Sequence, residues 1–244
     1  MLPSNIRKFI YLWSWDTRCR GVDTVKILHE MMNSETKILD AGCGDYGIGA
    51  FMPSADITGL DILPEQDIRI PIKYFRGSVV DLPFDKETFD ISVSVDVLEH
   101  LPESVRSEAV RQLVKVSKSA VVVTFPLGKP ARTIDEEFKV RLDQSNQPLP
   151  EWLEEHLSHN YPDHANVIET IDAEARKRGK TTLTRIYYSE NLGIARLLRR
   201  SNVYSRYAYI AINLLTGIFK GFVPGANEGN AYRVIVVSEF RNDK

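Results

Sequence analysis

The sequence contains very little cysteine. Among its 244 residues there are 2 cysteines, Cys19 and Cys43. Two cysteines are too few for a disulfide framework, and Cys43 stands inside a glycine-rich stretch where a bridge would be awkward. We therefore expect a protein of a reducing compartment, with a cytoplasmic location.

An excess of charge of one sign and a long apolar run are missing as well. The net charge is −2, and 43% of the residues are hydrophobic. This balance lacks the basic excess of a dedicated nucleic-acid binder, so we expect no nucleic-acid partner. Residues 1–16 lack the continuous apolar core and small-residue cleavage site of a signal peptide, which argues against secretion. Repeats and low-complexity tracts are also absent, and we expect a single domain over residues 1–244.

What the sequence does contain is an alternation of predicted strands and helices. Hydrophobic periodicity predicts an amphipathic helix over residues 17–32. Short apolar runs predict strands at 37–40, 56–61, 72–75, 89–95, 120–125, 181–188 and 232–240, and helical patterns cover 102–116, 163–177 and 190–222. Strands that alternate with helices indicate a parallel sheet, so we predict an α/β, doubly wound fold.

We expect three segments of the chain to have different roles. Residues 1–35 form a predicted N-terminal helical segment, residues 36–126 a cofactor-binding half, and residues 127–244 an acceptor-side half. Residues 126–150 are polar and contain several prolines. Such a stretch is typical of a surface loop, and we interpret it as an insertion that forms a lid above the strand ends.

A glycine-rich motif directly follows the first predicted strand. It reads Asp40-Ala-Gly-Cys-Gly-Asp-Tyr-Gly47, and Asp61 ends the next strand. Glycines let the backbone turn sharply and approach a ligand closely, and a carboxylate at the end of the second strand can accept hydrogen bonds from ribose hydroxyls. The motif therefore predicts a site for an adenosine-containing cofactor.

The same glycines also spell the G-x-G-x-x-G pattern of dinucleotide enzymes, so an NAD(P)-dependent oxidoreductase is an alternative. Asp40 argues against it. A carboxylate two residues before the first glycine would repel a pyrophosphate at short range. It would instead attract the ammonium group of S-adenosylmethionine, which carries no phosphate.

Motifs further along the chain bring a known family into view. They are Ile38-Leu-Asp-Ala-Gly-Cys-Gly44, Gly59-Leu-Asp61, Asp81-Leu-Pro-Phe84, Phe89-Asp90 and Val97-Leu-Glu-His-Leu-Pro102. In this order they resemble the class I, Rossmann-like S-adenosylmethionine-dependent methyltransferases, especially the small-molecule, type 11-like group. The resemblance covers about residues 37–126. It implies a mostly parallel seven-stranded sheet with an antiparallel last strand, S-adenosyl-L-methionine as cofactor and S-adenosyl-L-homocysteine as product.

The resemblance also implies which residues touch the cofactor. The glycine loop would contact the methionine moiety, Asp61 the ribose, the turn at residues 77–81 the adenine, and the end of the fourth strand the reactive methyl group. The cofactor-binding residues predicted in this way are Asp40, Gly42, Cys43, Gly44, Asp61, Ile62, Ser78, Val79, Asp81, Val95 and Asp96. Ser78 stands where the family often has Asp, so we expect the Ser78 hydroxyl, Asp81 or the backbone to meet the adenine amino group instead. Tyr46 stands where the family usually has Gly, and we expect local remodelling of that loop.

Candidate catalytic residues lie in the acceptor-side half. A hydroxyl acceptor would be helped by a base, and His156 and His159 have a spacing that would place them on one face of a helix. We interpret them as catalytic candidates on an acceptor-binding lid, with a solvated helix face as the alternative. Asp163 and His164 lie nearby, but no third ligand fixes a geometry, and we expect no metal. Glu99 and His100 are interpreted as bracing the loop beneath the cofactor.

Residues 190–222 combine arginines with an apolar run at 208–219. That run is shorter than the about 20 residues that a membrane span requires. A core helix with a basic exposed turn is the favoured interpretation, while peripheral membrane contact and a homodimer stay open. We predict methyl transfer to a small-molecule acceptor, preferably to an oxygen atom. A sugar, a lipid or an isoprenoid-like compound is the expected class of acceptor. A non-catalytic cofactor-binding module is the remaining alternative.

Overall fold

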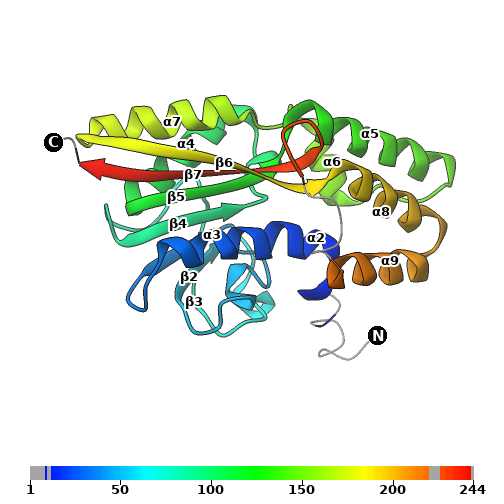
Figure 1. The fold of residues 1–244 in the computed structure, drawn as a ribbon, viewed down its shortest axis with the longest axis horizontal. Helices are drawn as coiled ribbons and strands as arrows, with labels where there is room; N and C mark the ends of the chain where they lie inside the picture. The colour runs from blue at the N-terminus through cyan, green and yellow to red at the C-terminus, as the bar shows by residue number, and fades with distance from the viewer. Residues whose placement is uncertain (1–8, 10–11, 220–225, 243–244) are drawn as a thin grey trace.

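The computed structural model describes residue 9, residues 12–219 and residues 226–242, and it shows one mixed sheet in the order β3-β2-β1-β4-β5-β7-β6 (Figure 1). The last strand, β7, pairs antiparallel with both of its neighbours, β5 and β6. The strands are β1 Lys37–Ala41, β2 Asp56–Asp61, β3 Lys73–Arg76, β4 Phe89–Val95, β5 Ser117–Pro126, β6 Lys180–Asn191 and β7 Ala231–Asn242. The predicted doubly wound fold with an antiparallel last strand is confirmed.

The central strands are apolar on both faces because helices cover both sides of the sheet. Leu39 and Val121 point into a core that they share with α4 (Glu103–Val116) and α7 (His164–Lys177). Their neighbours Ile38 and Val122 point to the opposite side, toward α3. The alternation of successive side chains along a strand therefore builds one core on each face of the sheet.

The predicted N-terminal helix is present as three consecutive pieces, the first of which begins at Trp15. They are α2 (Trp15–Thr17), a π-helical turn (Arg18–Val22) and α3 (Asp23–Met31). The glycine loop leads into a single 3-10 turn, Ile48–Ala50. Residues 1–8, 10 and 11 of the predicted N-terminal segment lie outside the described residues.

The prediction of a surface loop over residues 126–150 is wrong. Most of this stretch is helix α5, Gly128–Gln144. Its apolar residues Ala131, Ile134, Phe138 and Leu142 are spaced three or four apart and are buried. Pro130 stands in the first turn, where a missing N–H costs the helix no hydrogen bond. The prolines that suggested a loop therefore flank or start a helix.

The helical region predicted at 190–222 is two helices, α8 (Leu192–Tyr204) and α9 (Arg206–Ile218). They meet at Ser205, whose hydroxyl oxygen accepts a hydrogen bond from the Ala208 N–H at 3.2 Å. Together with α5 and α6 (Glu151–Ser158), they form a helical layer beyond the carboxyl ends of the parallel strands (Figure 1). Within the described residues, no helix combines the length and apolar character needed to cross a bilayer. Residues 220–222 lie outside the described residues.

Candidate functional site

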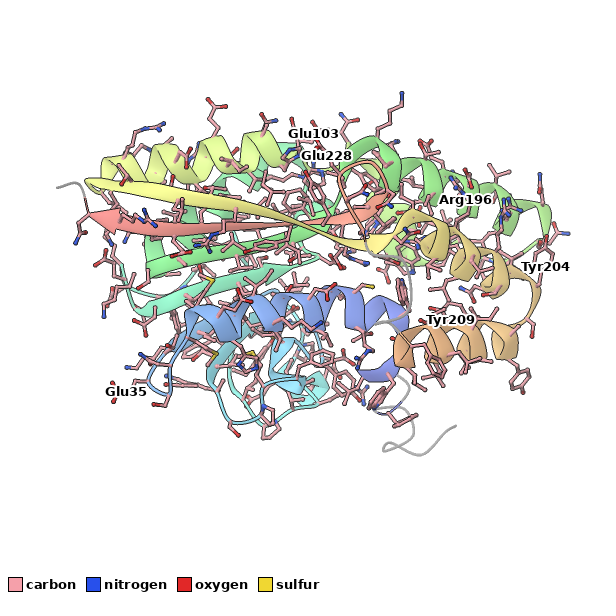
Figure 2. All side chains as sticks on the ribbon, in the orientation of Figure 1. Glu35, Glu103, Arg196, Tyr204, Tyr209 and Glu228 are labelled. Carbon is pink, nitrogen blue, oxygen red and sulfur yellow. The ribbon has the colours of Figure 1, made fainter. Side chains whose placement is uncertain are left out.

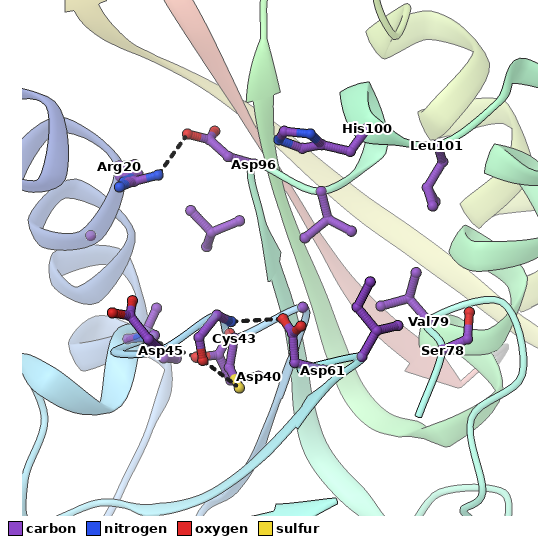
Figure 3. A pocket seen from close by; sticks show the side chains of 18 of the residues that line it. Arg20, Asp40, Cys43, Asp45, Asp61, Ser78, Val79, Asp96, His100 and Leu101 are labelled. Atoms are coloured by element: carbon purple, nitrogen blue, oxygen red, sulfur yellow. Dashed lines mark hydrogen bonds and ion pairs between the residues drawn. The ribbon is translucent and has the colours of Figure 1, made fainter. Parts of the chain in front are cut away.

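A cavity of about 420 Å³ opens at the carboxyl ends of β1, β2 and β4 (Figure 3). This is where ligands of open α/β sheets bind, and the volume lies in the usual range for small-molecule sites. Its lining includes the predicted cofactor residues Asp40, Gly42, Cys43, Gly44, Asp61, Ile62, Ser78, Val79, Val95 and Asp96. Asp81 is exposed and does not line the cavity; its N–H donates to the Ser78 carbonyl oxygen at 3.1 Å.

The glycine loop needs glycine for two separate reasons. Gly42 has φ +81°, and a Cβ atom at this position would collide with the Val97 side chain. Gly47 has φ +51°, and a Cβ atom there would collide with the Asp40 carboxylate. Other residues rarely adopt these left-handed conformations. The loop therefore packs tightly against the surrounding side chains. Gly47, which lies one position after Tyr46, where a glycine is usual, is the residue that makes room for Asp40.

Two carboxylates meet the cavity from neighbouring strands. The Asp40 Oδ2 atom accepts a hydrogen bond from the Ile48 N–H at 2.8 Å. Burial raises the pKa of Asp40 to about 7; the Ile48 hydrogen bond opposes this shift, and the charge of Asp61 adds to it. Asp61 accepts hydrogen bonds from the N–H groups of Gly44 at 2.8 Å and Leu63 at 3.1 Å. Both side chains are thus held in place as acceptors for a cationic or hydroxyl-bearing ligand.

This arrangement fits S-adenosylmethionine and disfavours a dinucleotide. Dinucleotide sites place the pyrophosphate against the N-terminus of a helix. Here the loop ends in a three-residue 3-10 turn, and Asp40, Asp45 and Asp61 all line the cavity. Three carboxylates would repel a diphosphate, whereas the buried carboxylate of Asp40 suits an ammonium group and Asp61 suits ribose hydroxyls.

The N-terminal segment supplies cavity residues that the sequence interpretation missed. Thr17, Arg20 and Gly21 line the cavity from above the glycine loop. A Cβ atom on Gly21 would collide with the ring of Phe51, so this glycine lets the π-helical turn pack closely on the loop. Arg20 reaches across to Asp96, with 3.8 Å between Nη1 and Oδ2 (Figure 3). Local sequence patterns carry no signal for such long-range packing.

A second cavity of about 340 Å³ adjoins the first and shares Arg20, Asp96 and His100 with it. The rest of its lining is mostly polar or aromatic and comes largely from the acceptor-side half. These residues are Glu99, Phe138, Trp152, His156, Glu190, Leu198, Arg199, Asn202, Tyr209, Tyr232 and Arg233. The two cavities together can hold two ligands side by side, one of them in a polar environment.

A buried ion-pair network separates the two cavities. The Arg233 Nε atom lies 3.0 and 2.8 Å from the two carboxylate oxygens of Asp96, and its guanidinium also pairs with Glu190. Asp96 has φ +53° and Glu190 has φ +59°, which are strained conformations for residues other than glycine. Backbone strain of this kind concentrates at functional sites, where surrounding contacts hold it in place. Arg233 therefore fixes the position of Asp96 between the cavities.

Two histidines meet in a T-shaped arrangement at the same boundary, with an angle of 66° between their ring planes. The Nε2 atoms of His100 and His156 are 3.3 Å apart. On their other side, His100 Nδ1 lies 2.5 Å from Glu155 Oε2, and His156 Nδ1 lies 3.4 Å from Asp135 Oδ2. Burial, followed by the neighbouring His156, lowers the pKa of His100, and the contact with Glu155 only partly offsets this. Each imidazole is thus held by a carboxylate from behind and directs its other nitrogen toward its partner.

Buried acids surround the histidine pair. Burial would raise the pKa of Asp135, but Arg199 and hydrogen bonds from His156, Tyr161 and Tyr232 together hold this pKa below its ordinary value. The Glu99 carboxylate is 1% exposed, and burial together with the charge of Asp96 raises its pKa well above the ordinary value.

The other predicted catalytic residue lies elsewhere. Helix α6 ends at Ser158, and His159 follows in an extended conformation with φ −126° and ψ 164°. The prediction that His156 and His159 share a helical face is therefore wrong, because the helix stops one residue too early. His159 lines neither cavity, whereas Glu99 and His100, interpreted as bracing residues, do. The adjacent Glu99 and His100 of the motif at residues 97–102 were the sequence signal that could have indicated these functional residues.

Comparisons with known proteins find one family model that matches part of the chain. The family model for the methyltransferase domain matches residues 39–124. These residues span the glycine loop, Asp61, the turn at 77–81 and the end of β4. No curated protein matches the sequence.

Several solved structures share the fold at low identity. A phosphoethanolamine N-methyltransferase 2 of Haemonchus contortus, in complex with phosphomonomethylethanolamine and S-adenosylhomocysteine, is 16% identical with a TM-score of 0.54, over 98% of this chain and 58% of that one. The magnesium protoporphyrin IX methyltransferase of Synechocystis PCC 6803, with bound S-adenosylhomocysteine, is 13% identical with a TM-score of 0.51, over 98% and 88%. The [4+2]-cyclase SpnF is 12% identical with a TM-score of 0.53, over 91% and 81%. These likenesses show the fold alone.

Proposed function

We propose that this chain, which carries an S-adenosylmethionine-dependent methyltransferase domain of the class I type, methylates an oxygen atom of a small polar molecule bound in the second cavity. The observation that carries the proposal is the meeting of the two cavities at Asp96 and His100. The first cavity is formed largely by the matched domain, and the second largely by residues beyond it. The first therefore suits the cofactor and the second the acceptor.

The residues of the first cavity would bind and orient the cofactor, which supplies a methyl group on a positively charged sulfur. Asp40 would hold the ammonium group, and Asp61 the ribose hydroxyls. Ser78 and Val79 line the end of the cavity away from the glycine loop, where the adenine is expected. Val95 and Asp96 lie at the end of β4 beside the second cavity. In-line placement of an acceptor against the methyl group supplies much of the rate in such a reaction.

The lining of the second cavity favours a polar acceptor. Arg199, Asn202 and Tyr209 offer hydrogen-bonding groups, and Trp152 offers an aromatic surface. Such a lining suits a sugar-like or hydroxylated ring compound better than an isoprenoid chain. An acceptor hydroxyl at the junction of the cavities would lie near the histidine pair, which suits a reaction in which the hydroxyl proton has to leave. This supports oxygen as the acceptor atom.

Calorimetry with S-adenosylhomocysteine and with NAD⁺ tests the cofactor assignment directly. We expect binding of S-adenosylhomocysteine and none of NAD⁺; the reverse result would require an oxidoreductase. Turnover is then followed with radiolabelled S-adenosylmethionine against hydroxylated small molecules, amines and carboxylic acids. Product formation from hydroxyl compounds alone supports the proposal. Cofactor binding without turnover of any acceptor class would instead favour the non-catalytic module.

Substitutions at the two histidines locate the acceptor site. His156→Ala should lower turnover at least tenfold while leaving the affinity for S-adenosylhomocysteine unchanged, because this residue lines only the second cavity. His159→Ala serves as the matched control and should retain full turnover. Equal losses in both variants would contradict the assignment of the second cavity to the acceptor.

A further inference from the structure

Three potential metal ligands converge at the boundary between the two cavities. Glu99 and His100 come from the 3-10 turn Leu98–His100 after β4, and His156 comes from α6. One ligand atom from each residue can be chosen so that all three atoms lie within 4.8 Å of one another. Two imidazole nitrogens and a carboxylate oxygen are donors that Zn²⁺ and Fe²⁺ accept in proteins.

The two imidazoles are oriented as metal-bound histidines are. His100 Nδ1 faces Glu155, and His156 Nδ1 faces Asp135. A carboxylate that accepts the Nδ1–H proton leaves the lone pair on Nε2, the usual tautomer of a metal ligand. Two neutral imidazoles in this state would point lone pairs at each other across 3.3 Å. A cation between them removes that repulsion.

The distances suit one shared ion. Two nitrogens bound to the same tetrahedral Zn²⁺ at ordinary bond lengths lie about 3.3 Å apart. The observed separation of His100 Nε2 and His156 Nε2 is 3.3 Å, and Glu99 Oε1 lies 3.9 Å from His156 Nε2. A displacement of the Glu99 carboxylate by about half an ångström would bring Glu99 Oε1 to the same spacing from His156 Nε2, and all three ligand atoms already lie within 4.8 Å of one another.

Glu99 supplies an independent observation. Its side chain is 1% exposed, and neither carboxylate oxygen has a hydrogen-bond partner among the residues that the structure describes. Buried carboxylates are normally hydrogen-bonded, paired or bound to a metal. The side chain lines the second cavity beside His156. Its buried oxygens are therefore available as ligand atoms on the side where the histidine nitrogens converge.

We propose that Glu99, His100 and His156 bind a divalent transition metal ion, with Zn²⁺ as the ion of choice, at the junction of the two cavities. Asp135 and Glu155 are the outer carboxylates that orient the two histidines. Asp135 is itself held by hydroxyl groups of Tyr161 at 2.6 Å and Tyr232 at 2.7 Å, so its position is rigid. The sequence pattern predicts no metal because it pairs His156 with His159, and only the fold brings His156 to Glu99 and His100.

Three protein ligands leave a coordination position for an exogenous oxygen. This part of the inference rests on the proposed function, because it takes the second cavity as the acceptor site. An acceptor hydroxyl bound to the ion would lose its proton more readily, since a bound cation lowers the pKa of coordinated hydroxyl groups. The ion would then select acceptors with a hydroxyl group that can reach the junction of the cavities.

Metal binding is tested on the full chain after treatment with a chelator and removal of the chelator. Titration with Zn²⁺ in a calorimeter should give one ion per chain, and titration with Co²⁺ should produce visible d–d absorption bands. His100→Ala and His156→Ala should each weaken Zn²⁺ binding at least tenfold, and Glu155→Gln, which removes the negative charge beside His100 Nδ1, should weaken it about tenfold. His159→Ala is the matched control and should bind Zn²⁺ as the unaltered protein does.

Thermal unfolding is measured on every variant, and S-adenosylhomocysteine affinity serves as an independent readout for His156→Ala and His159→Ala, which do not line the first cavity. Retained affinity shows that a variant is folded and that the cofactor cavity is intact. If the unaltered protein binds S-adenosylhomocysteine but takes up neither Zn²⁺ nor Co²⁺ at one per chain, the metal proposal is overturned while the proposed function stands. Zn²⁺ binding that survives both histidine substitutions overturns this site as well. Failure to bind S-adenosylhomocysteine, with Zn²⁺ binding intact, would count against the proposed function only.

Discussion

The Oδ2 atom of Asp40 accepts a 2.8 Å hydrogen bond from the backbone N–H of Ile48, and this contact fixes a buried carboxylate at the base of the first cavity. A single hydrogen bond does not compensate for burial, so the pKa of Asp40 is raised to about 7. The free protein therefore holds Asp40 partly protonated near neutral pH. A cationic ligand has to meet the ionised form, and this couples ligand binding to pH.

Cofactor affinity should increase as the pH rises through about 7. Below that value the ammonium group of S-adenosylhomocysteine has to displace a proton from Asp40, which costs up to about tenfold in affinity per pH unit. Calorimetry at several pH values between about 5.5 and 8 measures this slope. Asp40→Asn should bind at least tenfold more weakly at pH 8 and should lose the slope. A slope that persists in Asp40→Asn would assign it to another group.

The stability of the cofactor-free protein should change with pH in the opposite direction. Because the pKa of Asp40 is raised from 3.8 to about 7 on folding, its stabilising contribution is complete below about pH 4 and is lost as the pH rises through 7. Thermal unfolding between about pH 4 and pH 8 tests this. Relative to Asp40→Asn, the unaltered protein should lose stability with rising pH over this window; parallel curves would contradict the raised pKa.

Substitutions at Gly47, Gly44 and Gly179 separate backbone strain from collision. All three have positive φ, but only at Gly47 does a Cβ atom meet other atoms, those of Asp40 and Cys43. Gly179→Ala should cost about 1 kcal/mol of unfolding free energy, the price of strain alone. Gly47→Ala should cost about 3 kcal/mol, because the loop has to move as well.

The measurement is denaturant unfolding, combined with calorimetry of S-adenosylhomocysteine binding. Gly44→Ala should resemble Gly179→Ala in stability but should lose cofactor affinity, since its Cβ atom would enter the first cavity. Equal unfolding free energies for Gly47→Ala and Gly179→Ala would contradict the close packing of the loop on Asp40.

The role of Asp61 is tested by its removal. Asp61→Ala should weaken S-adenosylhomocysteine binding by about ten- to a hundredfold, because two hydrogen bonds to a charged acceptor are lost. Asp45→Ala is the matched control, since Asp45 also lines the cavity but pairs with Arg69 at 3.0 Å on the exposed side. Unchanged affinity in Asp61→Ala would refute the ribose assignment.

The cofactor half could be predicted from the sequence because its signals are local. The glycine loop and Asp61 lie one crossover apart, and parallel pairing of β1 with β2 brings them together; Gly44 and Asp61 are hydrogen-bonded. Helix α5 was missed although Ala131 and Ile134 begin a clear helical spacing. The prolines in that stretch are typical of a loop and obscure this periodicity.

The second cavity could not be predicted in the same way. Its lining comes from segments as distant in sequence as Glu99, Arg199 and Arg233, which only the packing of α6 and α8 on the strand ends brings together. His156 and His159 show the limit of spacing arguments. A spacing of three residues places them together only if the helix continues, and it ends at Ser158.

Removal of Arg233 should destabilise the protein strongly. Arg233→Met leaves the buried carboxylates of Asp96 and Glu190 without their shared cation, which costs about 3–5 kcal/mol of unfolding free energy. Arg241→Met, on the exposed end of the same strand, is the control and should change stability by less than about 0.5 kcal/mol. Adding Glu190→Gln to Arg233→Met should restore part of the loss. Wild-type stability in Arg233→Met would mean that the buried carboxylates of Asp96 and Glu190 do not need the charge of Arg233.

The exposed face of α9 allows a test of the peripheral membrane contact that the sequence left open. Tyr207, Leu215 and Ile218 are 85%, 54% and 47% exposed and follow a helical spacing along one face of α9, next to the exposed Tyr204 at the end of α8 (Figure 2). An exposed apolar helix face is typical of an interfacial helix. We expect the protein to sediment with vesicles that contain an anionic lipid, and the double variant Leu215→Glu with Ile218→Glu to stay in the supernatant.

Val140→Glu is the matched control for this experiment. Val140 is 52% exposed on α5, away from α9, so its substitution should leave vesicle binding unchanged. Light scattering on the same variants distinguishes membrane contact from dimerisation through the apolar face of α9. The unaltered protein could be a dimer that does not bind vesicles, with the double variant a monomer. In that case the apolar face of α9 joins two copies of the chain, and the membrane contact is refuted. A monomeric protein that binds no vesicles would refute both membrane contact and dimerisation through α9, because each of them would cover the apolar residues of this face.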